Sequence, residues 1–232
     1  MSNRIHHLPH AAPACANAYE TACNESLPEP LTAAGRALMV DAAASKLEEL
    51  FATLQIAHRS DQHMRDTPRR VAKMFVEEVF AGRYTAPPRL TDFDASPASG
   101  GLIVTGPIEL RSTCAHHMMP IYGHAYIGVL PGPNGKLIGL SKYDRVVDHF
   151  ASRPQVKEEL IGQIGEYLME ETAPRGLAVR ISAVHMCKTH RGVRATHQSR
   201  MVSTAYYGDM RTDAALKAEF LGECQTLERP TF

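Results

Sequence analysis

The sequence predicts an α+β fold in which an N-terminal helical hairpin precedes an antiparallel sheet. Up to about residue 82 the apolar residues recur at helical spacing, whereas later stretches run or alternate as strands do. The expected order is helix, helix, strand, strand, helix, helix, strand, strand. Strands that come in pairs, rather than alternating singly with helices, indicate antiparallel pairing.

The composition fits a globular protein without a strong overall charge. The chain has 232 residues, 44% of them hydrophobic, enough for one large domain or for a helical region followed by a core domain. Lys+Arg 25 balance Asp+Glu 25, so no net charge recruits nucleic acid or a membrane surface. No apolar run approaches the roughly 20 residues of a membrane helix, and the N-terminus lacks the apolar core of a signal peptide. We therefore expect a soluble cytoplasmic protein.

Residues 1–30 are expected to form a flexible tail, because they are rich in Ala, Pro, His and Asn and show no period. Residues 31–84 are expected to form the helical hairpin. The first helix carries one apolar stripe at helical spacing, formed by Leu47, Leu50, Phe51 and Leu54.

The second helix of the hairpin is expected to begin at Asp66-Thr67-Pro68, a capping residue followed by a proline of the first turn. It should end near Gly82. The proline-rich stretch 85–101 then reads as a linker into the second unit, residues 102–232.

The second unit is expected to open with two strands, over 102–110 and 121–130, because both are rich in β-branched and aromatic residues. A turn at 131–135 and a short strand through Ile138 follow. Ser141-Lys142-Tyr143-Asp144 has the form of a capping box and predicts the start of a helix.

A further helix is expected from about Pro154 to a point before Pro174. Alternation then returns in one row that runs through Leu177, Val179, Ile181, Ala183, His185 and Cys187. A last strand near 201–207 and a short helix over 212–221 complete the expected order.

A metal site is predicted from Cys114-Ala115-His116-His117, in the connection between the first two strands, together with Cys187. Thiolate and imidazole are the usual zinc ligands, and a site with three protein ligands leaves a fourth position for water. The five cysteines are odd in number and irregularly spaced, so they do not suggest disulfides. Spacing leaves two options for the histidine: an extended strand would pair Cys114 with His116, and a turn would pair it with His117.

Cations gather close to this cluster in the sequence. Residues 174–208 contain no Asp or Glu, and Lys142 and Arg145 add two cations at a helix start, where backbone N–H groups also favour anions. With Lys188 and Arg191, they make a polyphosphate ligand plausible. Aromatic residues are not interleaved with this stretch, which argues against nucleic acid. Glu158, early in a helix, would on its own be an ordinary solvated charge.

The ordered run of motifs over about residues 35 to 222 resembles the GTP cyclohydrolase I family. The residues that carry the resemblance are Asp66 to Met74, Cys114-Ala115-His116-His117 with Pro120, Gly139-Leu140-Ser141-Lys142 with Arg145, Arg153-Pro154-Gln155-Val156, Val184-His185-Met186-Cys187, and Arg191-Gly192-Val193.

The resemblance implies a tunnelling fold, an antiparallel sheet with helices on one face, assembled as a homodecamer of two pentamers with active sites at subunit interfaces. It implies that residues 102–232 form a zinc-dependent catalytic domain that hydrolyses the imidazole ring of GTP. That reaction releases C8 as formate and rearranges the remaining atoms to 7,8-dihydroneopterin triphosphate. The product would feed pterin and folate synthesis or a deazapurine pathway, and allosteric control is possible.

The resemblance also assigns roles to residues. Carried over by motif, the Zn²⁺ ligands are Cys114, His117 and Cys187, which selects His117 over His116. His116 and His185 would move protons, with His185 acting at N7 of the purine.

The remaining assignments concern the substrate. Ser141 would assist the later sugar rearrangement, and Glu158 would accept the guanine N–H groups. Lys142, Arg145 and Arg191 would hold the triphosphate, partly across a subunit boundary.

Two residues depart from the family pattern. Ala115 stands where bacterial members usually have Glu, and Lys157 stands where they usually have Gln, directly before the guanine-binding glutamate. Both changes make the pocket more positive. They suggest tighter phosphate binding, altered ribose contacts or a changed substrate preference. The competing functions are an enzyme that stops at a ring-opened formamidopyrimidine nucleotide, a non-catalytic zinc and GTP-binding scaffold, and a purely structural zinc site.

Overall fold

The computed structural model describes residues 21–94, 100–133 and 136–228, and the first twenty residues of the predicted tail lie outside this range. The helices are α1 (Ala33–Thr53), α2 (Thr67–Met74), the π-helical turn η2 (Phe75–Val79), α3 (Ala81–Tyr84), α4 (Leu140–Ala151), α5 (Lys157–Thr172), α6 (Met186–Thr189), the 3-10 turn η3 (Asp209–Arg211) and α7 (Ala214–Glu228). The strands are β1 (Asp92–Asp94), β2 (Ile103–Cys114), β3 (Pro120–Leu130), β4 (Lys136–Ile138), β5 (Pro154–Gln155), β6 (Gly176–His185) and β7 (Arg200–Gly208).

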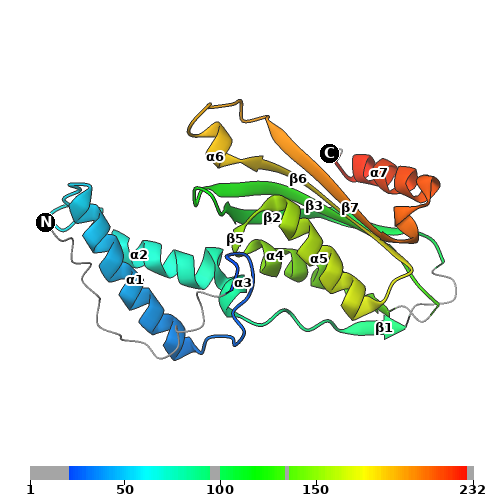
Figure 1. Ribbon diagram of the computed structural model, residues 1–232, viewed down its shortest axis with the longest axis horizontal. Coiled ribbons are helices and arrows are strands. Elements are labelled where there is room, and N and C mark those ends of the chain that lie inside the picture. The colour runs from blue at the N-terminus through cyan, green and yellow to red at the C-terminus, as the bar shows by residue number, and fades with distance from the viewer. Residues whose placement is uncertain (1–20, 95–99, 134–135, 229–232) are drawn as a thin grey trace, which may run out of the picture.

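A five-stranded sheet with the order β5-β2-β3-β6-β7 forms the centre of the protein (Figure 1). The pairs β2–β3, β3–β6 and β6–β7 are antiparallel, and the two-residue β5 runs parallel to the end of β2. The strands β1 and β4 form a separate small ribbon. The predicted α+β class with an antiparallel sheet is therefore confirmed.

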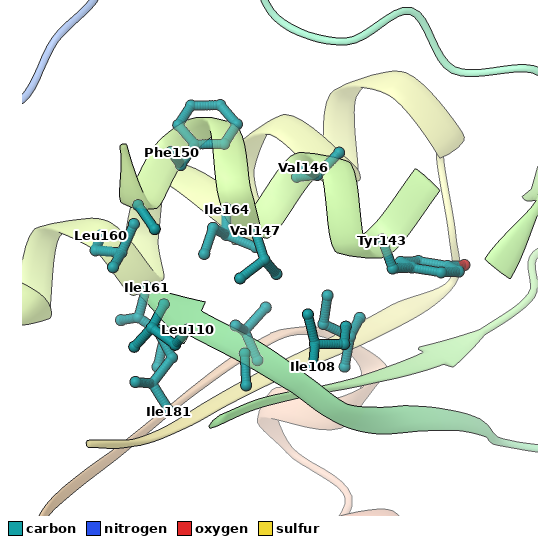
Figure 2. Packing of buried hydrophobic residues seen from close by; sticks show 14 of the residues in the cluster. Ile108, Leu110, Tyr143, Val146, Val147, Phe150, Leu160, Ile161, Ile164 and Ile181 are labelled. Atoms are coloured by element: carbon teal, nitrogen blue, oxygen red, sulfur yellow. The ribbon is translucent and has the colours of Figure 1, made fainter. Parts of the chain in front are cut away.

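The main hydrophobic core lies between one face of the sheet and helices α4 and α5 (Figure 2). Ile108 and Leu110 of β2 face Val147 of α4 and Ile164 of α5. All four side chains are at most 4% exposed, and burying side chains of this size is the principal force that holds the helices on the sheet.

Helix α7 covers part of the opposite face of the sheet. Its Phe220 and Cys224 pack with Tyr126 of β3 and Ala178 of β6, whose strand neighbours point into the main core. Because successive residues of a strand point to opposite faces, α7 and the α4–α5 pair lie on different sides (Figure 1).

The N-terminal helices form a smaller packed unit. Val40 of α1 packs against Ala72 and Val76 of the following helix. The predicted stripe of α1 is only partly buried, since Leu50 and Leu54 are 47% and 58% exposed. The division into tail, hairpin, linker and catalytic domain stays a prediction. None of the described helices has the length and apolar character needed to span a membrane.

Two helix starts differ from the expectation. Gly139 occupies the N-cap of α4, so the predicted capping box at Ser141 does not form. Pro154 belongs to β5 rather than to a helix, and α5 begins three residues later at Lys157. This shift matters for the site, because β5 pairs Gln155 with Cys114 and so fixes the start of α5 beside the metal loop.

Candidate metal centre and substrate site

The metal loop is a tight turn between β2 and β3. Cys114 ends β2, and its carbonyl accepts hydrogen bonds from the N–H groups of His117 and Met118 at 3.4 and 2.8 Å. Met118 has a φ of 52°, a left-handed conformation that lets the chain reverse within so few residues. The turn therefore brings Cys114 close to His117. This is the arrangement that the spacing predicts for a turn, whereas an extended strand would have paired Cys114 with His116.

Cys187 comes from another part of the fold. Strand β6 ends at His185, which lies opposite Ile121 at the start of β3, and the single turn α6 carries Cys187 back toward the loop. Ligand atoms of Cys114, His117 and Cys187 all lie within 4.8 Å of one another. His116 lies beside this group, with its Nδ1 3.8 Å from the Sγ of Cys114.

The donor set fits a divalent metal. Burial and then the hydrogen bond of the Cys187 thiol to Cys114 raise the pKa of Cys187, and the charge of a Cys114 thiolate raises it further. A bound Zn²⁺ would reverse this preference, since a coordinating thiol is deprotonated. Two cysteines and one histidine also leave a fourth tetrahedral position open, as in catalytic zinc sites.

His185, two residues before Cys187, has an unsatisfied ring nitrogen. Its Nε2 is buried and has no hydrogen-bond partner among the described residues. Burial lowers the pKa of His185, Lys157 and Lys188 lower it further, and Glu158 opposes them. When protonated, the imidazole would therefore give up its proton more readily than a solvated histidine does.

Lys157 and Glu158 begin helix α5 and differ sharply in exposure. Lys157 is 1% exposed and its Nζ has no partner among the described residues, whereas Glu158 is exposed. Burial lowers the pKa of Lys157, and the neighbouring carboxylate of Glu158 partly offsets this effect. A buried ammonium beside an accessible carboxylate offers both a donor and an acceptor to a polar ligand.

Arg191 reaches the metal group directly. Its Nη1 lies 2.9 Å from Nε2 of His117. Lys188, on α6, instead donates from Nζ to the hydroxyl of Ser199 at 2.8 Å. Among the cations of the described part of the chain near the site, Arg191 is the one in contact with a predicted ligand residue.

Three predicted site residues lie elsewhere in the same chain. Ser141, Lys142 and Arg145 are on the first turns of α4, whereas the carbonyl of Ala151 at the end of this helix accepts a hydrogen bond from Ser112 of β2 at 2.7 Å. Ten residues of α-helix span about 15 Å. Ser141 and Lys142 therefore lie at the far end of α4 from its contact with β2, and Arg145 lies about 9 Å along the helix from Ala151.

A chain of hydrogen bonds supports the metal loop, and sequence patterns did not predict it. The N–H of Ala115 donates to the carbonyl of Gln155 at 3.0 Å, and the Gln155 amide donates to Gln163 at 3.0 Å. Gln163 in turn donates to the carbonyl of Asn24 at 2.9 Å. The Asn24 amide also donates to Glu159, next to Glu158. Only the motif Arg153-Pro154-Gln155 hinted at a role here.

Comparisons with known proteins agree with one another. The family model described as GTP cyclohydrolase I matches residues 43–225. The protein of Mycolicibacterium vanbaalenii named GTP cyclohydrolase 1 is 42% identical over 158 residues, which cover 68% of this chain and 77% of that protein.

Two further relatives carry the same name. The protein of Mycobacteroides abscessus is 39% identical over 181 residues, covering 78% of this chain and 86% of its own. The protein of Mycobacterium avium is 40% identical over 181 residues with the same coverage of 78% and 86%.

Proposed function

The chain belongs to the GTP cyclohydrolase I family, and we propose that it hydrolyses the imidazole ring of GTP, releases formate and forms 7,8-dihydroneopterin triphosphate. The observation that carries this proposal is the group of Cys114, His117 and Cys187 with His116 and His185 beside it. Three ligands with two free imidazoles at their edge fit hydrolysis better than a purely structural site, which would need a fourth protein ligand.

Cys114, His117 and Cys187 would hold Zn²⁺ in this proposal. When bound, zinc supplies a Lewis acid that lowers the pKa of water toward about 7, which suits attack on C8 of the purine. The residues of the chain then have to place the purine and move its protons.

His185 would pass a proton to N7 of the purine, which makes C8 more electrophilic. Its lowered pKa, caused first by burial, makes the protonated imidazole a stronger acid. His116 is exposed beside Cys114 and would carry protons at the ribose ring oxygen and at the C8–N9 bond as it opens.

The substrate would be held at both ends. Glu158 would accept the N1–H and N2–H groups of guanine, and Arg191 would bind the triphosphate from the same chain. Ser141, Lys142 and Arg145 lie at the other end of α4 and would serve the site of a neighbouring subunit, Ser141 in the sugar rearrangement and the two cations at the triphosphate. This division of labour supports an oligomer with interface sites, for which we propose a decamer. A cytoplasmic location also stays a prediction.

The second candidate stops after ring opening and releases a formamidopyrimidine nucleotide. Ala115 and Lys157 are the reason for this candidate, because they make the pocket more positive than the usual family pattern does and so could alter the later steps of the reaction. A non-catalytic scaffold that only binds GTP is the third possibility.

One experiment separates these functions. The pure protein is incubated with GTP while formate and pterin fluorescence after oxidation are followed, and zinc is measured on the same sample. Formate and pterin in equal amounts support the proposal. Ring-opened nucleotide that keeps its formyl group, with neither formate nor pterin, would replace it by the second candidate. GTP binding without any turnover would replace it by the third.

A further inference from the structure

We propose that the N-terminal segment 21–27 holds the metal loop in place, and that Asn24 is the positioning residue through which it acts. The inference rests on the proposed function in one respect, because it takes the loop as a zinc site. It concerns residues that precede the stretch 43–225 matched by the family model. The consequence is that this segment sets how long the protein retains its zinc.

The metal loop leans on β5, a strand that has little support of its own. Strand β5 has two residues, lies at the edge of the five-stranded sheet and pairs only with the end of β2 in that sheet. The loop depends on it, because the N–H of Ala115 donates to the carbonyl of Gln155 at 3.0 Å. A strand this short gains little stability from pairing, so other contacts must keep β5 where the loop needs it.

A side-chain relay ties β5 to the N-terminal segment. The Gln155 amide donates to the carbonyl of Phe150 at 2.6 Å and to Oε1 of Gln163 at 3.0 Å. Gln163 donates in turn to the carbonyl of Asn24 at 2.9 Å. Because a backbone carbonyl only accepts, the Gln163 amide nitrogen has to face Asn24 and its oxygen has to face Gln155. The relay from Asn24 to the metal loop therefore has one orientation.

The buried guanidinium of Arg153 depends on the same segment. Arg153 is 3% exposed, and it donates to the carbonyl of Asn24 at 3.0 Å and to the hydroxyl of Ser26 at 2.9 Å. It also donates to Nε2 of His149 at 2.8 Å. A buried charged donor that loses its acceptors is costly, so the segment cannot leave without a large penalty at Arg153. The Asn24 carbonyl thus accepts one bond from each side of Pro154.

The segment, dark blue in Figure 1, is itself fixed against α3 and α5. The hydroxyl of Ser26 donates to the carbonyl of Gly82 at 3.0 Å, and the N–H of Leu27 donates to the carbonyl of Arg83 at 2.8 Å. Asn24 is 3% exposed, and its amide donates to Glu159 of α5. The side chain of Asn24 therefore fixes the position of the carbonyl that Gln163 and Arg153 use.

Two substitutions interrupt the relay at different links. Asn24→Ala removes the bond to Glu159 that anchors the segment. Gln163→Glu keeps an oxygen that can accept from Gln155 but places a carboxylate against the Asn24 carbonyl. Thr172→Val is the matched control, because it removes a buried hydrogen bond of 2.7 Å elsewhere in α5 and leaves the relay intact.

Two rates are measured on the purified full-length protein, well below its unfolding midpoint. One is the rate at which a chelator removes bound zinc, and the other is the rate of hydrogen exchange in peptides that contain Ala115. We expect both rates to rise about tenfold in Asn24→Ala and in Gln163→Glu, as for other residues that support metal ligands. Thr172→Val should lower the unfolding midpoint and keep both rates at the wild-type value, which separates positioning from a general loss of stability.

The double variant tests whether both residues act along one route. Asn24→Ala combined with Gln163→Glu should raise the zinc-release rate little more than either change alone, because a relay that is already interrupted has little left to lose. Multiplied effects would show two separate routes and would count against the relay.

Wild-type rates in Asn24→Ala would overturn the assignment and leave the proposed function intact, as would a rise no larger than in Thr172→Val. Faster zinc release without faster exchange at Ala115 would also overturn it, because the metal would then leave by another route. If Gln163→Glu does not fold, Asn24→Ala decides alone. A wild type that binds no zinc or does not process GTP would instead remove the proposed function, and exchange at Ala115 would still decide whether Asn24 positions the loop.

Discussion

Ala115 and Gln155 are joined by a backbone hydrogen bond of 3.0 Å that links the metal loop to the segment leading into α5. The bond lies next to the β2–β5 pairing of Cys114 with Gln155. It means that Cys114, a predicted metal ligand, and Glu158, a proposed substrate-binding residue, are held by one short piece of backbone. The metal and the purine are therefore expected to be placed relative to each other by the fold rather than by flexible side chains.

Cys187→Ser should abolish metal binding at stoichiometric levels, because a hydroxyl is a far weaker zinc ligand than a thiolate. Bound zinc per chain, measured by plasma mass spectrometry after dialysis, should fall at least about tenfold. Cys23→Ser is the matched control, since Cys23 is exposed and outside the metal group, and it should retain zinc. Equal zinc in both variants would contradict the ligand assignment.

His116→Ala and His185→Ala should each lower the rate of formate release by about 10²–10⁴-fold, the usual contribution of general acid–base groups. Both variants should keep their zinc, because neither residue belongs to the group of three ligands. His63→Ala, an exposed histidine far along the chain from the site, should behave as the wild type. Unchanged formate release in the two site variants would refute the catalytic roles.

Mixing two inactive variants should restore activity if the sites lie between subunits. Lys142→Ala removes a cation at the start of α4, which is proposed to serve the site of a neighbouring subunit. Cys187→Ser removes a predicted metal ligand from the chain's own site. In a mixed oligomer some interfaces receive an intact Lys142 from one chain and an intact Cys187 from another. Denaturing and refolding the two variants together should recover a fraction of the wild-type kcat, whereas each refolded alone should recover none. No recovery in mixed oligomers would place all site residues in one chain.

Stability should fall below neutral pH through His149. Burial, followed by the charge of Arg153, lowers the pKa of His149 to about 4, and the unfolded value is near 6.5. Between these values the unfolded chain binds the extra proton and the folded chain does not, so the stabilising effect is complete above about pH 6.5 and is lost as the pH falls toward 4. The slope is at most about 1.4 kcal/mol per pH unit.

Urea denaturation at pH 5 and pH 7 checks this. His149 accepts a hydrogen bond from Arg153 at 2.8 Å, so His149→Gln keeps an acceptor but cannot titrate. The variant should lose less stability than the wild type over this interval. The idea fails if both lose the same amount.

Gly82→Ala should destabilise the contact between α3 and α4. A Cβ at this position would lie 1.8 Å from the carbonyl oxygen of His149, and the N–H of Gly82 already bonds to the carbonyl of Ser152 at 2.9 Å. The backbones would have to separate, with a loss of roughly 2 kcal/mol or more in unfolding free energy. Gly222→Ala in α7, where nothing lies within 4 Å, should instead stabilise by about 1 kcal/mol. Calorimetric midpoints of the two variants should thus shift in opposite directions.

The strands and the core of this fold could be predicted because their signals are local. The alternating row from Leu177 predicts a strand, and β6 confirms it as far as His185. The continuation of this row to Cys187 is wrong, because Cys187 lies in the helical turn α6. The missed features depend on contacts between distant segments. Pro154 reads as a helix start until β2 is placed beside it, and Ser141 reads as a cap although Gly139 takes that position.

The candidate site was predictable in its residue types and only partly in its geometry. The motifs named Cys114, His117 and Cys187, and the structure places their ligand atoms within 4.8 Å. The burial of Lys157 was not evident, because a charged residue at a helix start normally faces solvent. Leu50 and Leu54 show the reverse case, apolar residues that were expected to be buried but are exposed. An apolar stripe in the sequence does not say whether the surface that covers it belongs to the same chain or to another.

The pairing of β3 with both β2 and β6 sets an order for acquiring the metal. Strand β3 reaches β2 across the short turn at Cys114, but its pairing with β6 joins residues as far apart as Ile121 and His185. Loops of such length close late, so the hairpin that carries Cys114 and His117 can form before Cys187 arrives. A newly made chain would then have a weak two-ligand site first and a three-ligand site only when β6 has joined the sheet. If the group binds zinc, tight zinc retention would thus mark a completed sheet.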